Sequence, residues 1–142
     1  MIYLDTGCLV KLYYPEPESA QVAALVAAQP IVYLALHELE LRNALELKLF
    51  RKEGRPAQVR AVQALVAEDL RAGTLHRPAL SWDDVLEEAT TFASSHTRKV
   101  GCRSLDILHC AAARLLSATA FVTTDDRQRR LAAIIGLACP EI

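Results

Sequence analysis

The chain has 142 residues, of which 52% are hydrophobic, and its formal net charge is −1. This length and composition suit one domain, predicted to span residues 1–142, that needs no disulfide bonds to hold its core. The near-neutral charge excludes a uniformly basic nucleic-acid-binding surface, so any contact with nucleic acid must be local.

Membrane insertion and secretion are also not expected. No apolar run reaches the length of a membrane span, and Asp5 and Lys11 interrupt the N-terminus where a signal peptide would be apolar. The four cysteines form no C-x-x-C pair, which argues against a zinc site. We therefore expect a cytoplasmic protein whose cysteines are small buried apolar residues, namely Cys8, Cys102, Cys110 and Cys139.

The first half of the chain alternates short apolar strands with helices. Apolar, β-branched and aromatic residues indicate the strands, and Pro15, Pro17 and Pro30 end the first two helices. In chain order we predict a strand over 1–4, helices over 6–14 and 19–28, a strand over 31–34, and helices over 37–52 and 56–71.

The second half continues the alternation. Ser81 is a good N-cap, Ser104 is expected to cap a very apolar helix, and Asp125 or Asp126 starts the last helix, which ends near Gly136. We predict an extended stretch over 74–80, a helix to about residue 95, a loop over 96–103, a helix over 105–116, a strand over 120–123, a final helix and an edge strand over 137–142. Such alternation is typical of an α/β fold with a parallel sheet and helices on both faces.

Two acidic residues directly follow predicted strands. Asp5 comes after MIYL and Asp125 comes after AFVTT. Because ligands of open α/β sheets bind beyond the carboxyl ends of the strands, both carboxylates are expected at one edge. The alternative for each is a helix N-cap, with Gln128 completing a capping-box-like pair for Asp125 and with Asp126 competing for the same role.

Two further acids lie in apolar helical patterns. Glu40 falls along the apolar stripe of its helix, although it could instead be a partly exposed acid paired with Arg42 or a more distant base. Asp106 opens a helix that is apolar almost all round, where the helix dipole alone could account for it. His109 follows at i+3 and could bond to a ligand or water, but a structural histidine is the favoured interpretation.

Four converging carboxylates predict a metal site. They would repel one another without a cation, and a hard divalent ion such as Mg²⁺ or Mn²⁺ prefers oxygen ligands. Such an ion would polarise a phosphodiester and activate water, which indicates a nuclease-type phosphodiesterase. No Walker loop, G-x-G-x-x-G or Ser/His/Asp order supports a rival chemistry. Arg103 and the cluster Arg127–Arg130 are candidates for phosphate contacts.

Four fragments, in this order, carry a resemblance to a known family. They are YLDTGCLVKLYYPEP with Asp5, LELRNAL with Glu40, LDILHCAAA with Asp106, and FVTTDDRQRRLA with Asp125. The chain resembles the PIN-domain ribonucleases, and within them the VapC-type toxins of toxin-antitoxin pairs, over essentially its whole length. It departs from the family pattern at position 7, where Gly7 replaces the usual Ser or Asn near the metal site.

The resemblance implies a PIN-like three-layer α/β/α fold with a central parallel sheet of four to five strands. It implies an Mg²⁺- or Mn²⁺-dependent endoribonuclease with an RNA substrate, a homodimer and a cognate VapB-like antitoxin. The residues that it assigns to catalysis and metal binding are Asp5, Glu40, Asp106 and Asp125, with Asp126 as the alternative to Asp125. We predict that further residues lie around these acids or contact substrate, namely Thr6, Thr123, Arg103, His109 and Arg127, of which the resemblance itself points to Thr123.

Two other functions stay open at the level of sequence. A PIN-like module could act by binding RNA or protein with little or no catalysis, although the retained acids argue against this. A metal-dependent hydrolase of small phosphate esters is the other alternative. Cleavage of RNA in the presence of Mn²⁺, compared with cleavage of a small phosphodiester, distinguishes the three.

Overall fold

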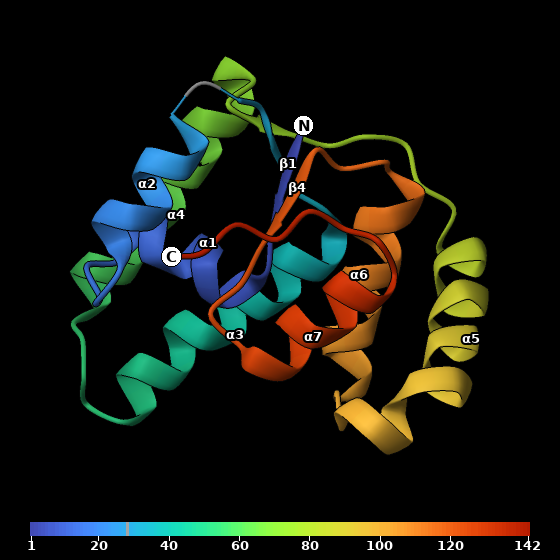
Figure 1. Ribbon diagram of the computed structural model, residues 1–142. Helices are drawn as coiled ribbons and strands as arrows, with labels where there is room; N and C mark the ends of the chain where they lie inside the picture. Colours follow the sequence, from blue (N-terminus) through green and yellow to red (C-terminus); the bar gives the residue numbers. More distant parts are fainter. Residues whose placement is uncertain (28) are drawn as a thin grey trace.

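The computed structural model describes residues 1–27 and 29–142, and a parallel sheet lies at the centre of this part of the chain (Figure 1). The sheet has four strands in the order β3-β2-β1-β4. Every pairing is parallel, so the carboxyl ends of all the strands meet at one edge. The strands are β1 (Ile2–Leu4), β2 (Ile31–Val32), β3 (Leu75–His76) and β4 (Ala120–Val122).

Helices cover both faces of the sheet, which confirms the predicted three-layer α/β/α architecture. Figure 1 shows α2 and α4 on one side of β1 and β4, with α5 and α6 on the other. The seven helices of the described residues are α1 (Thr6–Tyr13), α2 (Ser19–Val26), α3 (Ala35–Phe50), α4 (Pro56–Ala72), α5 (Trp82–Val100), α6 (Ser104–Leu115) and α7 (Asp126–Ile134).

The period-2 alternation of β1 divides the core into two layers. Ile2 and Leu4 pack with buried residues of α1, α2, α3 and α4, whereas Tyr3 packs with buried residues of α5, α6 and α7. All three side chains are at most 2% exposed. A strand that is buried on both faces reads as a continuous apolar run, as MIYL does.

Two predictions for the C-terminal half are wrong. The segment 96–103 was expected to be a loop, but α5 continues through Val100, which is buried. Gly101, with φ of 75°, ends this helix, and Arg98 and Lys99 in its last turn suit the helix dipole. The segment 137–142 forms no strand, and one backbone bond, from Phe121 to Ala138, ties it to β4.

Smaller differences concern element ends. The second strand stops at Val32 because Leu34 already occupies the N-cap of α3, which begins at Ala35 and ends at Phe50. Ser104 is the first residue of α6, and the cap position belongs to Arg103. The helix predicted over 19–28 ends at Val26, and its last predicted position lies outside the described residues.

The cysteines match the expectation of small apolar residues. All four are free thiols; Cys8, Cys102 and Cys110 are buried and Cys139 is half-buried. The pKa of Cys102 is raised to about 11, chiefly by burial. Asp106 and Asp125 also raise this pKa, and Arg127 and Arg103 lower it by less. Separately, none of the helices in the described ranges combines the length and apolar character needed to cross a bilayer.

A four-residue ion network of Lys11, Glu16, Glu18 and Lys48 joins α1, α3 and the connection between α1 and α2. Glu16 accepts a hydrogen bond from Lys48 at 2.6 Å and another from Lys11 at 3.3 Å. Burial alone would raise the pKa of Glu16, but the two lysines outweigh burial and lower it below its usual value of 4.5. This carboxylate therefore stabilises the fold above its unfolded pKa, and the stabilisation disappears as the pH falls through the folded pKa.

Replacement of Glu16 by Gln tests this network. We expect Glu16→Gln to lower the free energy of unfolding by about 1 kcal/mol near neutral pH, because a half-buried carboxylate loses two charged donors. The difference from wild type should shrink between neutral pH and pH 3, since the wild-type carboxyl becomes protonated as the pH falls through its lowered pKa. Urea denaturation at both pH values measures it, with Glu46→Gln on the exposed face of α3 as the control. A difference of the same size at both pH values would contradict the assignment.

Candidate active site

The four predicted acids come from four separate chain segments, and all of them line one cavity of about 250 Å³. The cavity lies beyond the carboxyl ends of β1 and β4, next to the N-terminal ends of α6 and α7. Parallel pairing of β1 with β4 places the residues that follow both strands side by side, as Asp5 N–H bonds to Val122 O at 2.9 Å. The residues that line it are Asp5, Thr6, Gly7, Glu40, Arg103, Asp106, His109, Thr124, Asp125 and Gln128.

Asp5 is both the N-cap of α1 and a wall of the cavity. Its Oδ1 accepts the backbone N–H of Cys8 at 2.7 Å, and its Oδ2 accepts the hydroxyl of Thr123 at 2.6 Å. The residue is only 8% exposed. Asp5 therefore lies at the edge of the sheet and also caps a helix, which are the two positions considered for it from the sequence. Gly7 leaves room beside it, since a Cβ at this position would lie 3.5 Å from Oδ1 of Asp5, which is an ordinary contact.

The hydroxyl of Thr123 connects three of the elements around the cavity. Besides Asp5, its Oγ1 lies 2.8 Å from Oε1 of Gln128 and accepts the backbone N–H of Asp125 at 2.9 Å. One hydroxyl hydrogen serves either Asp5 or Gln128 at a time. Because Thr123 is fully buried, the network holds the end of β4 and the start of α7 against Asp5.

Glu40 reaches the cavity from the second turn of α3. Its Oε2 accepts the hydroxyl of Thr6 at 2.8 Å and lies 2.5 Å from Nε2 of His109. Burial would raise the pKa of Glu40, but the bonds and charge of His109 and the Thr6 bond outweigh it, and the pKa is lowered. Glu40 is thus a partly buried carboxylate held in its ionised form, and Arg42 pairs with Glu38 instead.

A buried hydrogen-bond chain fixes the orientation of the His109 ring. The hydroxyl of Tyr3 lies 2.9 Å from Nδ1 of His109, while Nε2 faces Glu40 and lies 3.3 Å from Oγ1 of Thr6. Burial raises the pKa of Tyr3 well above its usual value, so this residue keeps its proton. Because Nε2 faces the Glu40 carboxylate, which can only accept, the ring carries a hydrogen on Nε2 and donates it to Glu40.

Asp106 lies in the first turn of α6 and is paired with Arg103. Its Oδ2 accepts the backbone N–H of Arg103 at 3.2 Å and the Nε–H of the same residue at 3.0 Å. Its Oδ1 has a longer contact of 3.4 Å with Nη2 of Arg103. The carboxylate thus caps the helix and also binds a guanidinium.

Asp125 is the N-cap of α7. Its Oδ1 accepts the backbone N–H groups of Arg127 and Gln128, at 2.8 and 2.9 Å. The reciprocal half of the expected capping box is replaced, since the N–H of Asp125 bonds to Thr123 and the side chain of Gln128 does not reach it. Asp125 lines the cavity, whereas Asp126 begins the helix and is exposed.

Sequence reasoning missed His37, which ties β1 to α3. Its Nδ1 accepts the backbone N–H of Leu34 at 3.0 Å and its Nε2 donates to the carbonyl of Leu4 at 2.9 Å. Burial lowers the pKa of His37 to about 3, so the ring is neutral. The i,i+3 spacing from Leu34 is that of a capping box with His in place of Glu or Gln, and this spacing was the available signal.

Gln128 has a larger role than a helix cap. It is 1% exposed, and besides its contact with Thr123 its Nε2 donates to the backbone carbonyl of Asp106 at 3.2 Å. It therefore joins the start of α7 to the start of α6. A glutamine among charged residues gives no periodic signal, so its burial could not be read from the sequence.

The donor chemistry of this cavity fits a hard divalent cation. Existing hydrogen bonds use Oε2 of Glu40 and Oδ1 of Asp125, and within the described residues no donor binds the second oxygen of either group. As the side chains stand, no three Asp, Glu, His or Cys residues in this part of the chain are close enough to hold one ion. Ion binding therefore requires the carboxylates to move closer together.

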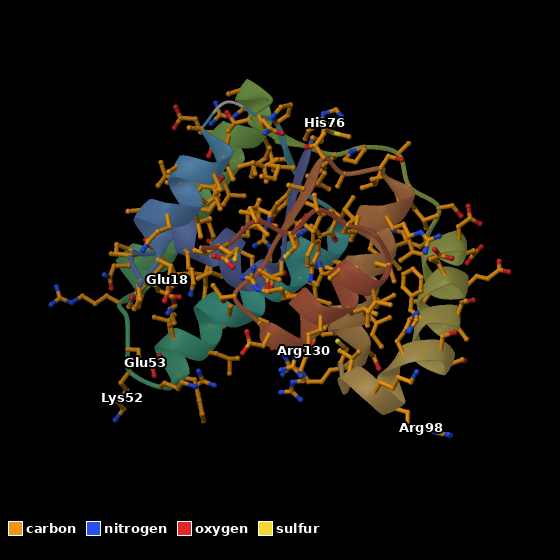
Figure 2. The ribbon with its side chains drawn as sticks, viewed as in Figure 1. Glu18, Lys52, Glu53, His76, Arg98 and Arg130 are labelled. Atoms are coloured by element: carbon orange, nitrogen blue, oxygen red, sulfur yellow. The ribbon has the colours of Figure 1, made fainter. Side chains whose placement is uncertain are left out.

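The basic residues of α7 that were expected to contact phosphate differ in how firmly they already bind other parts of the protein. Arg129 is half-buried and donates to the carbonyls of Thr123 and Pro140, at 2.7 and 3.0 Å, so it holds the backbone. Arg127 is exposed and has one long contact with the carbonyl of Gly101. Arg130 is exposed and projects outwards from α7 (Figure 2). Arg127 and Arg130 thus remain available for phosphate contacts.

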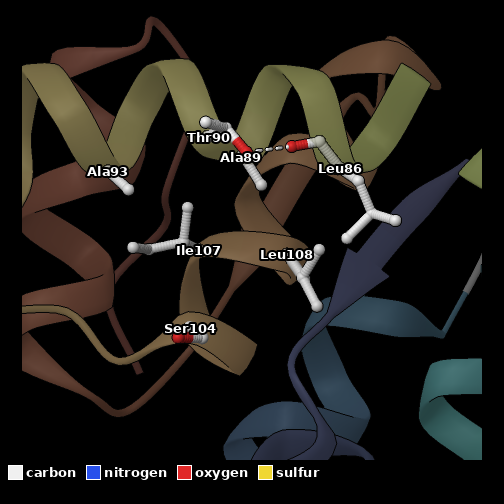
Figure 3. Close-up of a pocket in the computed structure, with 7 residues that line it drawn as sticks. All are labelled: Leu86, Ala89, Thr90, Ala93, Ser104, Ile107 and Leu108. Carbon is white, nitrogen blue, oxygen red and sulfur yellow. Dashed lines mark hydrogen bonds between the residues drawn. The ribbon is translucent and has the colours of Figure 1, made fainter. Parts of the chain in front are cut away.

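A second cavity lies between α5 and α6 (Figure 3). It measures about 170 Å³ and no charged side chain is among its lining residues, which are Leu86, Ala89, Thr90, Ala93, Ser104, Ile107 and Leu108. Its polar lining residues are Thr90 and Ser104, and none of the lining residues is a carboxylate, histidine, lysine or arginine. The acidic cavity is therefore the candidate active site.

Comparison with known proteins agrees with this fold. A curated relative, "Ribonuclease VapC47" of Mycobacterium tuberculosis (strain CDC 1551 / Oshkosh), is 30% identical over 134 residues, covering 89% of this chain and 86% of the relative. FitAcB from Neisseria gonorrhoeae superposes with a TM-score of 0.65 at 20% identity, covering 99% of this chain and 97% of that one.

VapBC2 from Rickettsia felis, crystallised with a DNA fragment from its promoter, superposes with a TM-score of 0.64 at 16% identity, covering 99% of this chain and 98% of that one. At these identities the two solved structures establish the fold alone. The sequence itself matches the PIN domain family over residues 2–134. The chain belongs to the PIN-domain family.

Proposed function

We propose that the protein is an Mg²⁺- or Mn²⁺-dependent endoribonuclease and the toxin of a VapBC-type toxin-antitoxin pair, acting in the cytoplasm. One observation carries the proposal: carboxylates from four distant segments, Asp5, Glu40, Asp106 and Asp125, line a single cavity. Four like charges in one cavity are costly unless a cation offsets them. The similarity to a relative named as a VapC ribonuclease supports RNA as the substrate.

The roles of the residues follow from their positions. Asp5, Glu40 and Asp106 would be the main ligands, and Asp125 would complete the set or orient the attacking water. A divalent ion held by these oxygens supplies Lewis-acid polarisation of the phosphodiester. Thr6 and His109 bind Oε2 of Glu40, which leaves Oε1 free to bind the cation. Thr123 and the backbone N–H of Cys8 each bind one oxygen of Asp5 and so fix the orientation of its carboxylate.

The partners are part of the same proposal. A neighbour of similar fold is the VapBC2 complex, which supports a cognate VapB-like antitoxin for this chain. A homodimer is also proposed, and the large apolar side chains exposed on several helices are candidates for such a contact. These residues are Leu39, Leu47, Phe50, Leu65, Leu86, Leu105, Leu115 and Ile134. Since β1 pairs with β4, residues from both ends of 1–142 share one sheet, which supports one PIN domain.

Asp5→Asn tests the proposal most directly. Asparagine keeps an oxygen that can accept the N–H of Cys8, so α1 retains its cap while the cavity loses a charge. We expect RNA cleavage with Mn²⁺ to fall by roughly 100-fold or more. The metal-free protein should be as stable as wild type or more stable, because repulsion is relieved. Cleavage of labelled RNA and thermal unfolding measure the two effects.

Glu38→Gln is the matched control, since Glu38 binds Arg77 and Arg42 outside the cavity. It should cleave RNA at the wild-type rate. Chelation with EDTA should stop wild-type cleavage, and a small phosphodiester should be a much poorer substrate than RNA. Asp5→Asn that cuts RNA as fast as wild type would refute the ligand assignment. RNA binding without any cleavage would instead favour a binding module.

Thr123→Val removes one hydroxyl and preserves the shape of the side chain. The change leaves the N–H of Asp125 and Oδ2 of Asp5 each without a buried partner. We expect the free energy of unfolding to fall by about 1–3 kcal/mol and cleavage to slow by roughly tenfold. Denaturant titration and initial rates on RNA measure these changes. Thr90→Val, on the exposed face of α5, controls for loss of a hydroxyl; equal effects of the two variants would argue against a special role for Thr123.

A further inference from the structure

Arg103 has an unusual position for a basic residue. It occupies the N-cap of α6, where the positive end of the helix dipole disfavours a cation and acids are preferred. The side chain is 73% exposed, so burial of its aliphatic part does not explain the position. A cation at the start of a helix is unfavourable unless another interaction compensates for it. Here the compensating interaction is with Asp106, which lines the cavity.

The guanidinium of Arg103 lies against Asp106 at the wall of the cavity. Arg103 is the one Lys or Arg among the described residues that line the cavity, which four carboxylates also line. Its Nε donates to Oδ2 of Asp106 and its Nη2 reaches Oδ1, so both oxygens of that carboxylate contact it. Asp106 foremost, and then Asp125 and Glu40, raise its pKa further.

We propose that Arg103 is an internal counter-ion that competes with the divalent cation for Asp106, and that it must swing away before Asp106 can ligate. This inference rests on the proposed function. In the metal-free protein the guanidinium partly neutralises the cavity. When the ion binds, the same guanidinium is released at the mouth of the cavity, where RNA phosphate would approach.

The geometry makes this exchange inexpensive. The carboxylate of Asp106 is only 16% exposed, whereas the Arg103 side chain is largely in solvent and can leave without dragging buried groups with it. The backbone N–H of Arg103 also donates to Oδ2 of Asp106, so the carboxylate stays oriented after the side chain departs. An ion pair whose guanidinium lies largely in solvent is weak enough for a divalent ion to displace.

Direct ion-binding measurements on the metal-free protein, without RNA, test the proposal. Isothermal titration calorimetry with Mn²⁺ should show Arg103→Gln binding about three- to tenfold more tightly than wild type, because no competitor has to be displaced. Arg103→Lys, which keeps the charge but loses the planar fork, should lie between them. Arg127→Gln removes an equal charge near the cavity without touching Asp106 and should change affinity much less.

A structural readout accompanies the affinities. In the NMR spectrum of ¹⁵N-labelled wild type, the Nε–H resonance of Arg103, assigned by its absence in Arg103→Gln, should shift during an Mg²⁺ titration with the same midpoint as binding. Unchanged or weaker Mn²⁺ affinity in Arg103→Gln, or an equal gain in Arg127→Gln, would overturn the competition. An Nε–H resonance that stays in place at Mg²⁺ saturation would also overturn it.

These outcomes separate the two proposals. If wild type and Arg103→Gln bind Mn²⁺ with equal, measurable affinity, the counter-ion role fails and the metal-dependent nuclease stands. If none of the variants binds Mn²⁺ or Mg²⁺, the metal-dependent function itself fails, and the counter-ion role fails with it.

Discussion

The parallel pairing of β1 with β4 is the interaction on which the site depends. These strands share three register pairs, and the bond from the N–H of Asp5 to the carbonyl of Val122 continues the pairing beyond the strand ends. Two acids that are far apart in sequence thereby emerge at the same edge. The Thr123 hydroxyl then fixes their relative position, because it contacts Asp5 and accepts the N–H of Asp125.

Two buried polar side chains, His37 and Gln128, position Glu40 and Asp106. His37 links the carbonyl of Leu4 to the N–H of Leu34, so the first turn of α3 is tied to the end of β1. This bond brings Glu40 within reach of Thr6 and His109. Gln128 in turn anchors the start of α6, which carries Asp106. A layer of hydrogen bonds thus supports the charged groups, as metal and catalytic sites require.

The sequence allowed the main architecture, and the convergence of the four acids on one cavity, to be predicted for identifiable reasons. Asp5 and Asp125 follow apolar strands, and parallel strands bring such positions together. Glu40 was visible through the 3.6-residue periodicity of α3. The partners of these acids were less accessible: a helical wheel does not say that His109 lies against Glu40, because the two are 69 positions apart in the chain.

The misjudged segments have local explanations. Residues 96–100 are polar for the most part and suggested a loop, yet the helix persists because Val100 is buried and Gly101 adopts the left-handed conformation that ends it. The terminal segment 137–142 is apolar enough for a strand, but Pro140 lacks an N–H and the ladder does not extend past one bond. The pairing of Arg103 with Asp106 was not foreseen, since a cation at a helix start opposes the dipole.

The contact between Thr123 and Asp5 spans 118 positions of the chain, and this separation has a consequence for biosynthesis. Contacts of such high order form late, because the loop between them must close first. A polypeptide still emerging from the ribosome holds Asp5, Glu40 and Asp106 before β4 exists. Its sheet lacks one edge, and the hydroxyl that orients Asp5 has yet to be made. Translation products that stop short of β4 therefore cannot assemble this cavity.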